Sequence, residues 1–134
     1  MNESERGLVT AWWALRLGIG LTAFLAGLDK YFDLLTTWEM YLSPAVERLL
    51  PMPPATFLHI VGVVEMAAGL LVLSKWTRIG AYVVAAWLGA IAIQLATTAM
   101  FFDLAVRDLV MALAAFALAK LTEWHSVRLT QAGR

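Results

Sequence analysis

The stretch HIVGVVEMAAGLLVL, residues 59–73, is an apolar run with one acidic residue, Glu65, in its middle. A long run of Ala, Leu and Val with scattered Gly is typical of a membrane-spanning helix, because the strands of a membrane barrel alternate apolar and polar residues. A charge at the centre of a bilayer costs about 3 kcal/mol or more, so it normally faces the protein interior and has a partner. The stretch therefore predicts a transmembrane helix and a buried partner for Glu65.

Three further apolar runs accompany this one in the 134-residue chain, which is 61% hydrophobic. Soluble globular domains are closer to one half apolar. We therefore predict an all-α, polytopic membrane protein: a single domain, residues 1–134, built as a four-helix transmembrane bundle. The predicted spans cover residues 10–28, 57–73, 79–97 and 104–121, each near the lower end of the length that crosses a bilayer.

The composition excludes several kinds of site and partner. The formal net charge is zero and no basic block occurs, so we expect no nucleic-acid partner. The chain has no cysteine, which excludes disulfides, thiolate nucleophiles and iron–sulfur ligation. No metal-ligand spacing occurs, and His59 and His125 are predicted on opposite sides of the membrane, so we expect neither a metal site nor a haem.

Lysine and arginine are more frequent on one side of the predicted bundle, the side that holds both termini and the joint at residues 74–78. That side has Arg6, Lys75, Arg78, Lys120, Arg128 and Arg134, whereas the other side has Lys30, Arg48 and Arg107. Cytoplasmic loops carry the excess of Lys and Arg, so both termini are predicted to be cytoplasmic.

The segment DKYFDLLTTWEMYLSPAVERLLPMPP, residues 29–54, connects the first two spans on the outer side. Its apolar residues recur every three or four positions with charges between them, and prolines end the pattern. We predict an amphipathic helix lying on the outer leaflet, followed by a turn set by proline. This segment would be either a cap that seals the bundle or a lid over a lipid-soluble ligand.

Arg16 is the predicted partner of Glu65. Counted from the predicted inner ends of their spans, Arg16 lies about 9 Å and Glu65 about 12 Å into the bilayer. Small residues share a face with each charge and would let the two helices approach closely; they are Gly20, Ala23 and Gly27 on the first helix and Gly62 and Gly69 on the second. The predicted Arg16–Glu65 ion pair would either lock the two helices in register or make Glu65 a proton-handling group.

A second group of polar residues is predicted at the outer ends of the helices. It consists of Asp29, Lys30, His59, Gln94, Asp103, Arg107 and Asp108. Such carboxylates, an imidazole, an amide and a guanidinium in one layer could hold a quinone head group and relay its protons. They could equally be ordinary polar residues of helix ends, with Asp108 favoured by the dipole of its helix.

Three segments resemble the DoxX family of small four-helix bacterial membrane proteins: ALRLGIGLTAFLAGLDKYFDLL (residues 14–35), GVVEMAAGLLVLSKWTRIGA (62–81) and FFDLAVRDLVMALAAFALAK (101–120). The positions that match are Arg16, Gly27, Lys30, Glu65, Gly69, Thr77, Arg78, Arg107 and Asp108. The resemblance implies a redox setting in the bacterial inner membrane, because the related DoxD subunit belongs to thiosulfate:quinone oxidoreductase and other relatives act in thiol-redox complexes. Since this chain has no cysteine, the resemblance favours a quinone-linked subunit over a thiol oxidoreductase.

Three functions remain open from the sequence. The first is a membrane subunit of a quinone-linked redox system, with quinone as its ligand and no catalytic cofactor of its own. The second is a non-catalytic accessory or anchor subunit that stabilises a larger membrane complex. The third is a small-solute transporter, which would need a homo-oligomer because four short helices rarely enclose a path.

Overall fold

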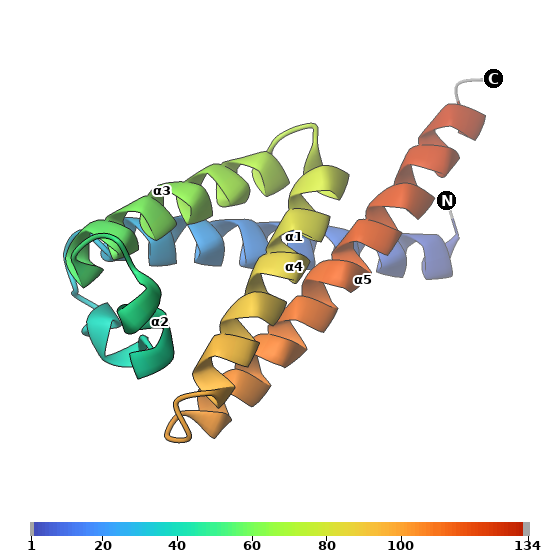
Figure 1. Ribbon diagram of the computed structural model, residues 1–134. Coiled ribbons are helices and arrows are strands. Elements are labelled where there is room, and N and C mark those ends of the chain that lie inside the picture. The colour runs from blue at the N-terminus through green and yellow to red at the C-terminus, as the bar shows by residue number, and fades with distance from the viewer. Residues whose placement is uncertain (1, 133–134) are drawn as a thin grey trace.

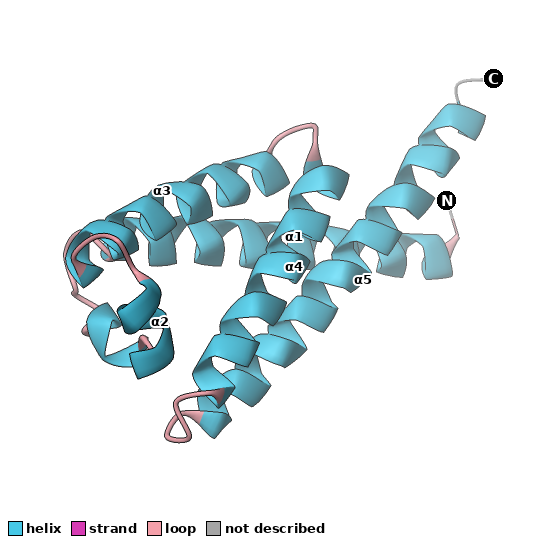
Figure 2. Cartoon of the chain, viewed as in Figure 1, coloured by secondary structure: helices cyan, strands magenta, loops and turns pink. Residues whose placement is uncertain are grey.

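The computed structural model describes residues 2–132, and all of its regular secondary structure is helical (Figures 1 and 2). The elements in chain order are α1 (Glu3–Asp29), the 3-10 helix η1 (Trp38–Tyr41), α2 (Pro44–Leu49), α3 (Pro54–Leu73), α4 (Thr77–Ala96) and α5 (Phe102–Ala132). No strand occurs in this range, which confirms the predicted all-α class.

Three helices, α1, α3 and α4, are long and apolar enough to cross a membrane. Among the described residues α5 does not join them, although residues 104–121 were predicted to be the fourth span. Its uninterrupted apolar part, residues 109–119, lies between Asp108 and Lys120. That part is about 16 Å long at helical rise, roughly half of a bilayer's hydrocarbon thickness.

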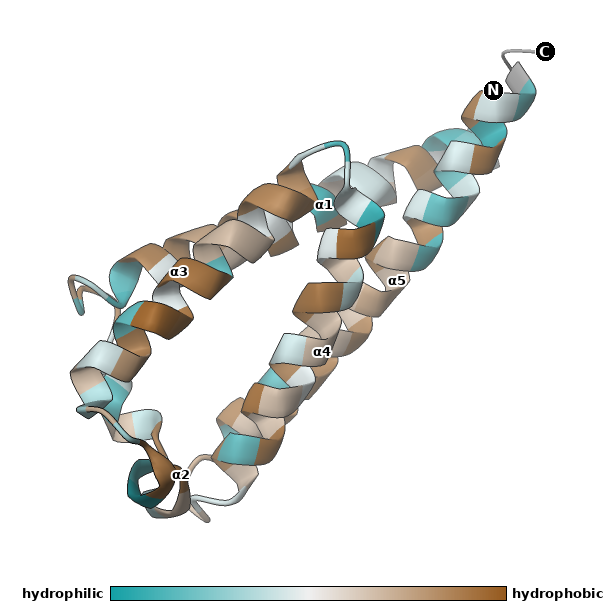
Figure 3. Cartoon of the chain, turned by 45° about the horizontal axis from the view of Figure 1, so that its top comes forward, coloured by the Kyte–Doolittle hydropathy of each residue, from teal (hydrophilic) through white to brown (hydrophobic). Residues whose placement is uncertain are grey.

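The four long helices form two antiparallel pairs (Figure 1). In the first pair α1 lies along α3, and in the second α4 lies along α5. The pairs meet near the turn between α3 and α4 and diverge from there, with the segment between α1 and α3 at the divergent end (Figure 3). This arrangement places that segment close to the ends of all four helices that lie away from the α3–α4 turn, where Ser43 bonds Gln94 and Tyr41 contacts Phe101.

Two glycine pairs set the register of α1 against α3. A Cβ atom built on Gly27 would lie 2.5 Å from the carbonyl oxygen of Gly62, and one built on Gly62 would lie 2.6 Å from that of Gly27. Further along, a Cβ on Gly69 would lie 2.6 Å from the carbonyl oxygen of Gly20. The backbones therefore touch, as expected where small residues line a helix interface in lipid, and the predicted small-residue faces are confirmed.

The buried core lies where the two helix pairs meet. Its residues are Trp12, Ile19, Ala68, Val72, Ala81, Val84, Ala115, Leu118 and Ala119. On the opposite face of α1, large apolar side chains such as Leu17, Leu21 and Leu25 are exposed. Apolar residues also cover much of α3 and α4 in Figure 3. Exposed apolar helix faces of this extent fit a lipid environment, and the protein is a membrane protein.

The segment at residues 30–53 is not the continuous amphipathic helix that the apolar spacing predicted. The carboxylate of Asp29 accepts hydrogen bonds from the backbone N–H groups of Leu34 and Leu35, at 3.0 and 2.9 Å, which closes a turn directly after α1. Asp33 has a positive φ of 51° within that turn. Pro44 then starts the separate short helix α2, with the Ser43 side chain as its N-cap. Local side-chain capping therefore competes successfully with a longer helix.

Candidate functional site

Lys30 and Glu65 form a buried ion pair between the end of α1 and the middle of α3. Lys30 Nζ lies 2.6 Å from Glu65 Oε2, and the two side chains are only 6% and 9% exposed. The aliphatic stem of Lys30 is long enough to extend back along α3 from the C-terminal end of α1. Glu65 thus has the buried cationic partner that its position in an apolar helix requires.

Two tryptophans complete the surroundings of this pair. Trp87 of α4 donates from its Nε1 atom to Glu65 Oε1 at 3.2 Å, which links the two helix pairs. Trp38 of η1 places its ring 3.8 Å from Lys30 Nζ, a cation–π contact. The same indole donates to Asp29 Oδ2 at 3.0 Å. The pair is therefore enclosed by groups from α1, η1, α3 and α4.

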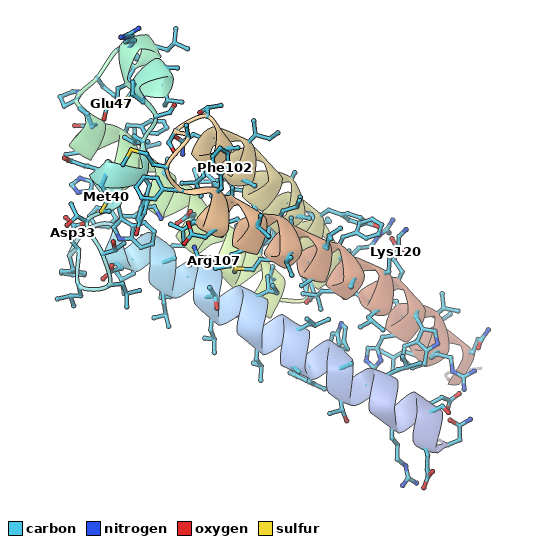
Figure 4. All side chains as sticks on the ribbon, turned by 90° about the horizontal axis from the view of Figure 1, so that it is seen from below. Asp33, Met40, Glu47, Phe102, Arg107 and Lys120 are labelled. Carbon is cyan, nitrogen blue, oxygen red and sulfur yellow. The ribbon has the colours of Figure 1, made fainter. Side chains whose placement is uncertain are left out.

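Asp108 of α5 is a further buried carboxylate at this end of the molecule, with 7% of its side chain exposed. Its hydrogen-bond donor is the neighbouring guanidinium of Arg107 at 3.3 Å, and that side chain is 60% exposed. Lys30 is close enough to Asp108 for their charges to interact. Figure 4 shows Arg107 at the end of α5 nearest the segment that contains Asp33 and Met40, with Lys120 further along the helix.

We call the group formed by Asp29, Lys30, Glu65, Arg107 and Asp108, together with Trp38 and Trp87, the Lys30 cluster. It contains three carboxylates and two cations, and the second cation is exposed to its surroundings. In a medium of low dielectric constant such charges are costly unless they are paired, and the Lys30–Glu65 and Arg107–Asp108 contacts provide this pairing. The exposed guanidinium of Arg107 can also donate to an acceptor oxygen from outside the chain.

The predicted Arg16–Glu65 ion pair is wrong. Arg16 donates instead to three carbonyl oxygens at the end of α3, those of Val72 (3.2 Å), Leu73 (2.6 Å) and Ser74 (3.0 Å). In the glycine-set register Arg16 thus lies level with Leu73, which is eight residues, or about 12 Å, from Glu65. The prediction counts the depth of Arg16 in the bilayer from residue 10. That part of α1, however, extends past the end of α3 and packs on α5, where Trp12 Nε1 donates to the hydroxyl of Thr122 at 2.8 Å.

Of the predicted polar layer, Asp29 and Lys30 lie at the end of α1 and Arg107 pairs with Asp108 near the start of α5, whereas the other three members lie outside the cluster. His59 is exposed and stacks on Tyr31, with ring centroids 4.5 Å apart. Gln94 accepts a hydrogen bond from the backbone N–H of Ser43 at 2.5 Å and so holds the segment before α2 against α4. Asp103 is exposed near the start of α5.

Sequence reasoning missed Trp38 and Trp87 and assigned Glu65 to the wrong group of residues. Trp87 lies in the middle of an apolar span, away from the interfacial positions that tryptophan prefers. An indole N–H within a span needs a buried acceptor. The need of the Trp87 indole for a buried acceptor was therefore the signal in the sequence, because Glu65 is the carboxylate inside a neighbouring apolar run. Trp38 had no such signal, because its position depends on the turn that Asp29 closes.

At the opposite end of the molecule, Glu123 of α5 neutralises two cations. It accepts from the hydroxyl of Tyr82 at 2.7 Å, from Arg78 at 3.1 Å and from Lys120 at 3.4 Å. The hydrogen bond from Tyr82, assisted by the two cations, holds the pKa of the Glu123 carboxyl below its usual value. Arg128 pairs with Glu5 nearby. These contacts join the ends of α1, α4 and α5.

Comparison with known protein families identifies the chain through its helical region. The family model described as DoxX matches residues 11–102, more than half of the chain. The chain belongs to the DoxX family. The matched part of this DoxX protein contains Arg16, Lys30, Glu65 and Trp87, whereas Arg107 and Asp108 lie just beyond it. No curated protein and no solved structure matches the chain.

Proposed function

We propose that this DoxX protein is an integral subunit of a quinone-linked redox system in a bacterial inner membrane, and that the Lys30 cluster contacts the quinone head group. The observation that carries this proposal is the charge of the cluster. Three carboxylates and two cations gather between helices that are otherwise apolar. Ionisable groups inside a membrane protein are costly and normally mark a functional site.

The chemistry of a quinone suits these groups. Each quinone carbonyl is an acceptor, and the exposed guanidinium of Arg107 has free donors for it. A quinone reduced by two electrons from a partner subunit would take up two protons. Asp108, which is buried beside Arg107, would in its protonated form supply one of them as a general acid, and the second would come from water. Because a lipid-soluble quinone arrives from the bilayer, a site between membrane helices is accessible to it.

Tryptophan fluorescence offers a direct test, because Trp38 and Trp87 both contact the cluster. Quinone-free protein in lipid nanodiscs would be titrated with a short-chain ubiquinone analogue. We expect saturable quenching of the fluorescence, and a dissociation constant that rises about tenfold in Asp108→Asn, as for the loss of one charge-assisted contact.

Asp103→Asn is the matched control for this experiment. It removes an exposed carboxylate five residues earlier on the same chain segment, and it should leave the dissociation constant unchanged. Quenching that rises linearly with quinone in all three proteins would reflect partition into lipid and would refute a head-group site in the cluster.

The proposal includes four membrane spans with both termini in the cytoplasm. Support for α5 as the fourth span comes from its antiparallel packing along α4 and from its buried positions Ala112, Ala115 and Ala119. Support for the orientation comes from the distribution of Lys and Arg, because the end of the molecule that holds both termini has twice as many as the other.

A second candidate function, an accessory subunit of a larger membrane complex, is favoured by a different observation. Within residues 2–132 no buried side-chain nitrogen or oxygen lacks a hydrogen-bond partner. The polar contacts of the cluster therefore also hold the helices together. This role predicts stable partners in a mild-detergent extract. Native mass spectrometry that finds only this chain, as a monomer or homo-oligomer, would refute it.

A further inference from the structure

The turn between α3 and α4, residues 74–76, lies at the surface of the membrane because it joins two helices that are each able to span it. Two tryptophans at this level are exposed: Trp76 in the turn (54%) and Trp13 on α1 (46%). Tryptophan prefers the layer of lipid head groups, where its ring is in apolar surroundings and its N–H is in a polar one. The turn is therefore level with the phosphate groups of one leaflet.

Arg16 places an unneutralised positive charge against this turn. Its Nε and Nη2 atoms donate to the carbonyl oxygens of Val72, Leu73 and Ser74, while its Nη1 atom makes no hydrogen bond within residues 2–132. In the same range Arg16 forms no salt bridge, and its guanidinium lies 5.0 Å from the ring of Trp13. The two N–H groups of Arg16 Nη1 can thus donate to an anion.

Lys75 directly follows Ser74, whose carbonyl oxygen accepts a hydrogen bond from Arg16, and it adds a second positive charge. It is exposed, its Nζ lies 5.0 Å from the ring of Trp76, and it forms no salt bridge in the described part of the chain. Three other cations at this end are different, because Arg78 and Lys120 pair with Glu123, and Arg128 pairs with Glu5. The first turn of α4 has no acidic residue either.

We infer that Arg16 and Lys75, flanked by Trp13 and Trp76, bind the head group of one anionic phospholipid. The phosphate would accept from Arg16 Nη1 and Lys75 Nζ, and an acyl chain would lie along exposed apolar residues such as Leu17. Arg16 is 14 residues, or about 21 Å, along α1 from Lys30, so this site does not depend on quinone binding. Basic pockets between membrane helices are suited to anionic lipids through the same electrostatics.

Native mass spectrometry of the protein released from mixed micelles would measure this binding. The lipids offered would be phosphatidylglycerol, which is anionic, and phosphatidylcholine, which is zwitterionic, with the same acyl chains, so that only the head group differs. We expect one phosphatidylglycerol molecule to be retained in preference to phosphatidylcholine. A separate arm with inorganic phosphate tests the free anion, and we expect it to displace the lipid only weakly.

Lys75→Gln should weaken phosphatidylglycerol binding about fivefold, as for the loss of one basic residue near a membrane surface. Lys75 is exposed, so its replacement leaves the packing of the helices intact. Arg48→Gln, which removes an exposed cation in α2, should bind lipid like the wild-type protein. Equal retention of the two lipids, unchanged binding in Lys75→Gln, or full displacement by millimolar phosphate would each overturn the inference.

Discussion

Glu65 illustrates how a single ionised side chain constrains its neighbours inside a membrane protein. Its carboxylate holds Lys30 at 2.6 Å and accepts from Trp87 at 3.2 Å, so three helices are tied to one group. Breaking a buried pair by removing one partner leaves an uncompensated charge, whereas removing both partners restores neutrality. The effect of such substitutions therefore depends on which partner remains.

Lys30→Met should lower the free energy of unfolding by about 3–5 kcal/mol, because Glu65 would remain buried and unpaired. The double variant Lys30→Met/Glu65→Met should regain most of this loss, since neither charge remains. Thermal unfolding in detergent, followed by circular dichroism, would compare the three proteins. A double variant as unstable as the single one would show that the pair is not the source of the stability.

At the residue scale, the need of Glu65 for a partner could be predicted from the sequence, but the identity of that partner could not. Arg16 lies on α1 and Lys30 directly follows this helix, so the choice between them depends on how far α1 is shifted along α3. The glycine faces were visible in the sequence. Pairing Gly20 with Gly69 and Gly27 with Gly62 would have placed Arg16 opposite the end of α3.

At the scale of elements, α1 and α3 are held together by contact between their backbones. Gly62 and Gly69 each face the carbonyl oxygen of a glycine on α1, and a methyl group at either position would overlap with backbone atoms. Backbone atoms cannot move aside as a flexible side chain would, so any added Cβ must separate the two helices. Gly89 of α4 differs, because a Cβ there would meet nothing within 4 Å.

Gly62→Ala should destabilise the protein by about 1–3 kcal/mol, the usual cost of overpacking a tight interface. Gly89→Ala should be neutral or slightly stabilising, because alanine is favoured over glycine within a helix. The unfolding temperatures of the two variants in the same detergent would test this difference. Equal destabilisation by both would mean that helix propensity, and not interhelical contact, governs the result.

The positions of α1, α3 and α4 could be predicted from hydropathy, because burial in lipid demands long apolar runs. The segment at residues 30–53 could not, because its conformation depends on individual side-chain bonds. Asp29 accepts from Leu34 and Leu35, and this turn competes with the helix that the apolar spacing favours. Periodicity alone does not register such capping interactions.

At the scale of the whole molecule, the two helix pairs diverge from their common core, and the ends of the molecule differ in charge. Among the described residues, the end with the α3–α4 turn has six cations and three carboxylates. The opposite end, which includes the Lys30 cluster, has three cations and seven carboxylates. The crossing of the pairs could not be predicted from the sequence, because apolar faces with little periodicity do not specify which helix they meet.

Reporter fusions would test the four-span topology of the whole chain. Alkaline phosphatase is active only outside the cytoplasm, whereas green fluorescent protein fused to these sites fluoresces only when it remains in the cytoplasm. Fusions at the two termini should both report the cytoplasm, and an insertion at residue 48 should report the outside. Termini on opposite sides would mean that α5 does not span the membrane.

The pairing of α1 with α3 also bears on how the chain is made. Both helices leave the ribosome before α4 and α5, so their glycine contacts can form while the second half is still being translated. The hairpin of α4 and α5 would then pack against an α1–α3 pair that has already formed in the membrane. A defect in the glycine contacts would consequently arise early, at the translocon, where membrane proteases and chaperones act on half-made chains.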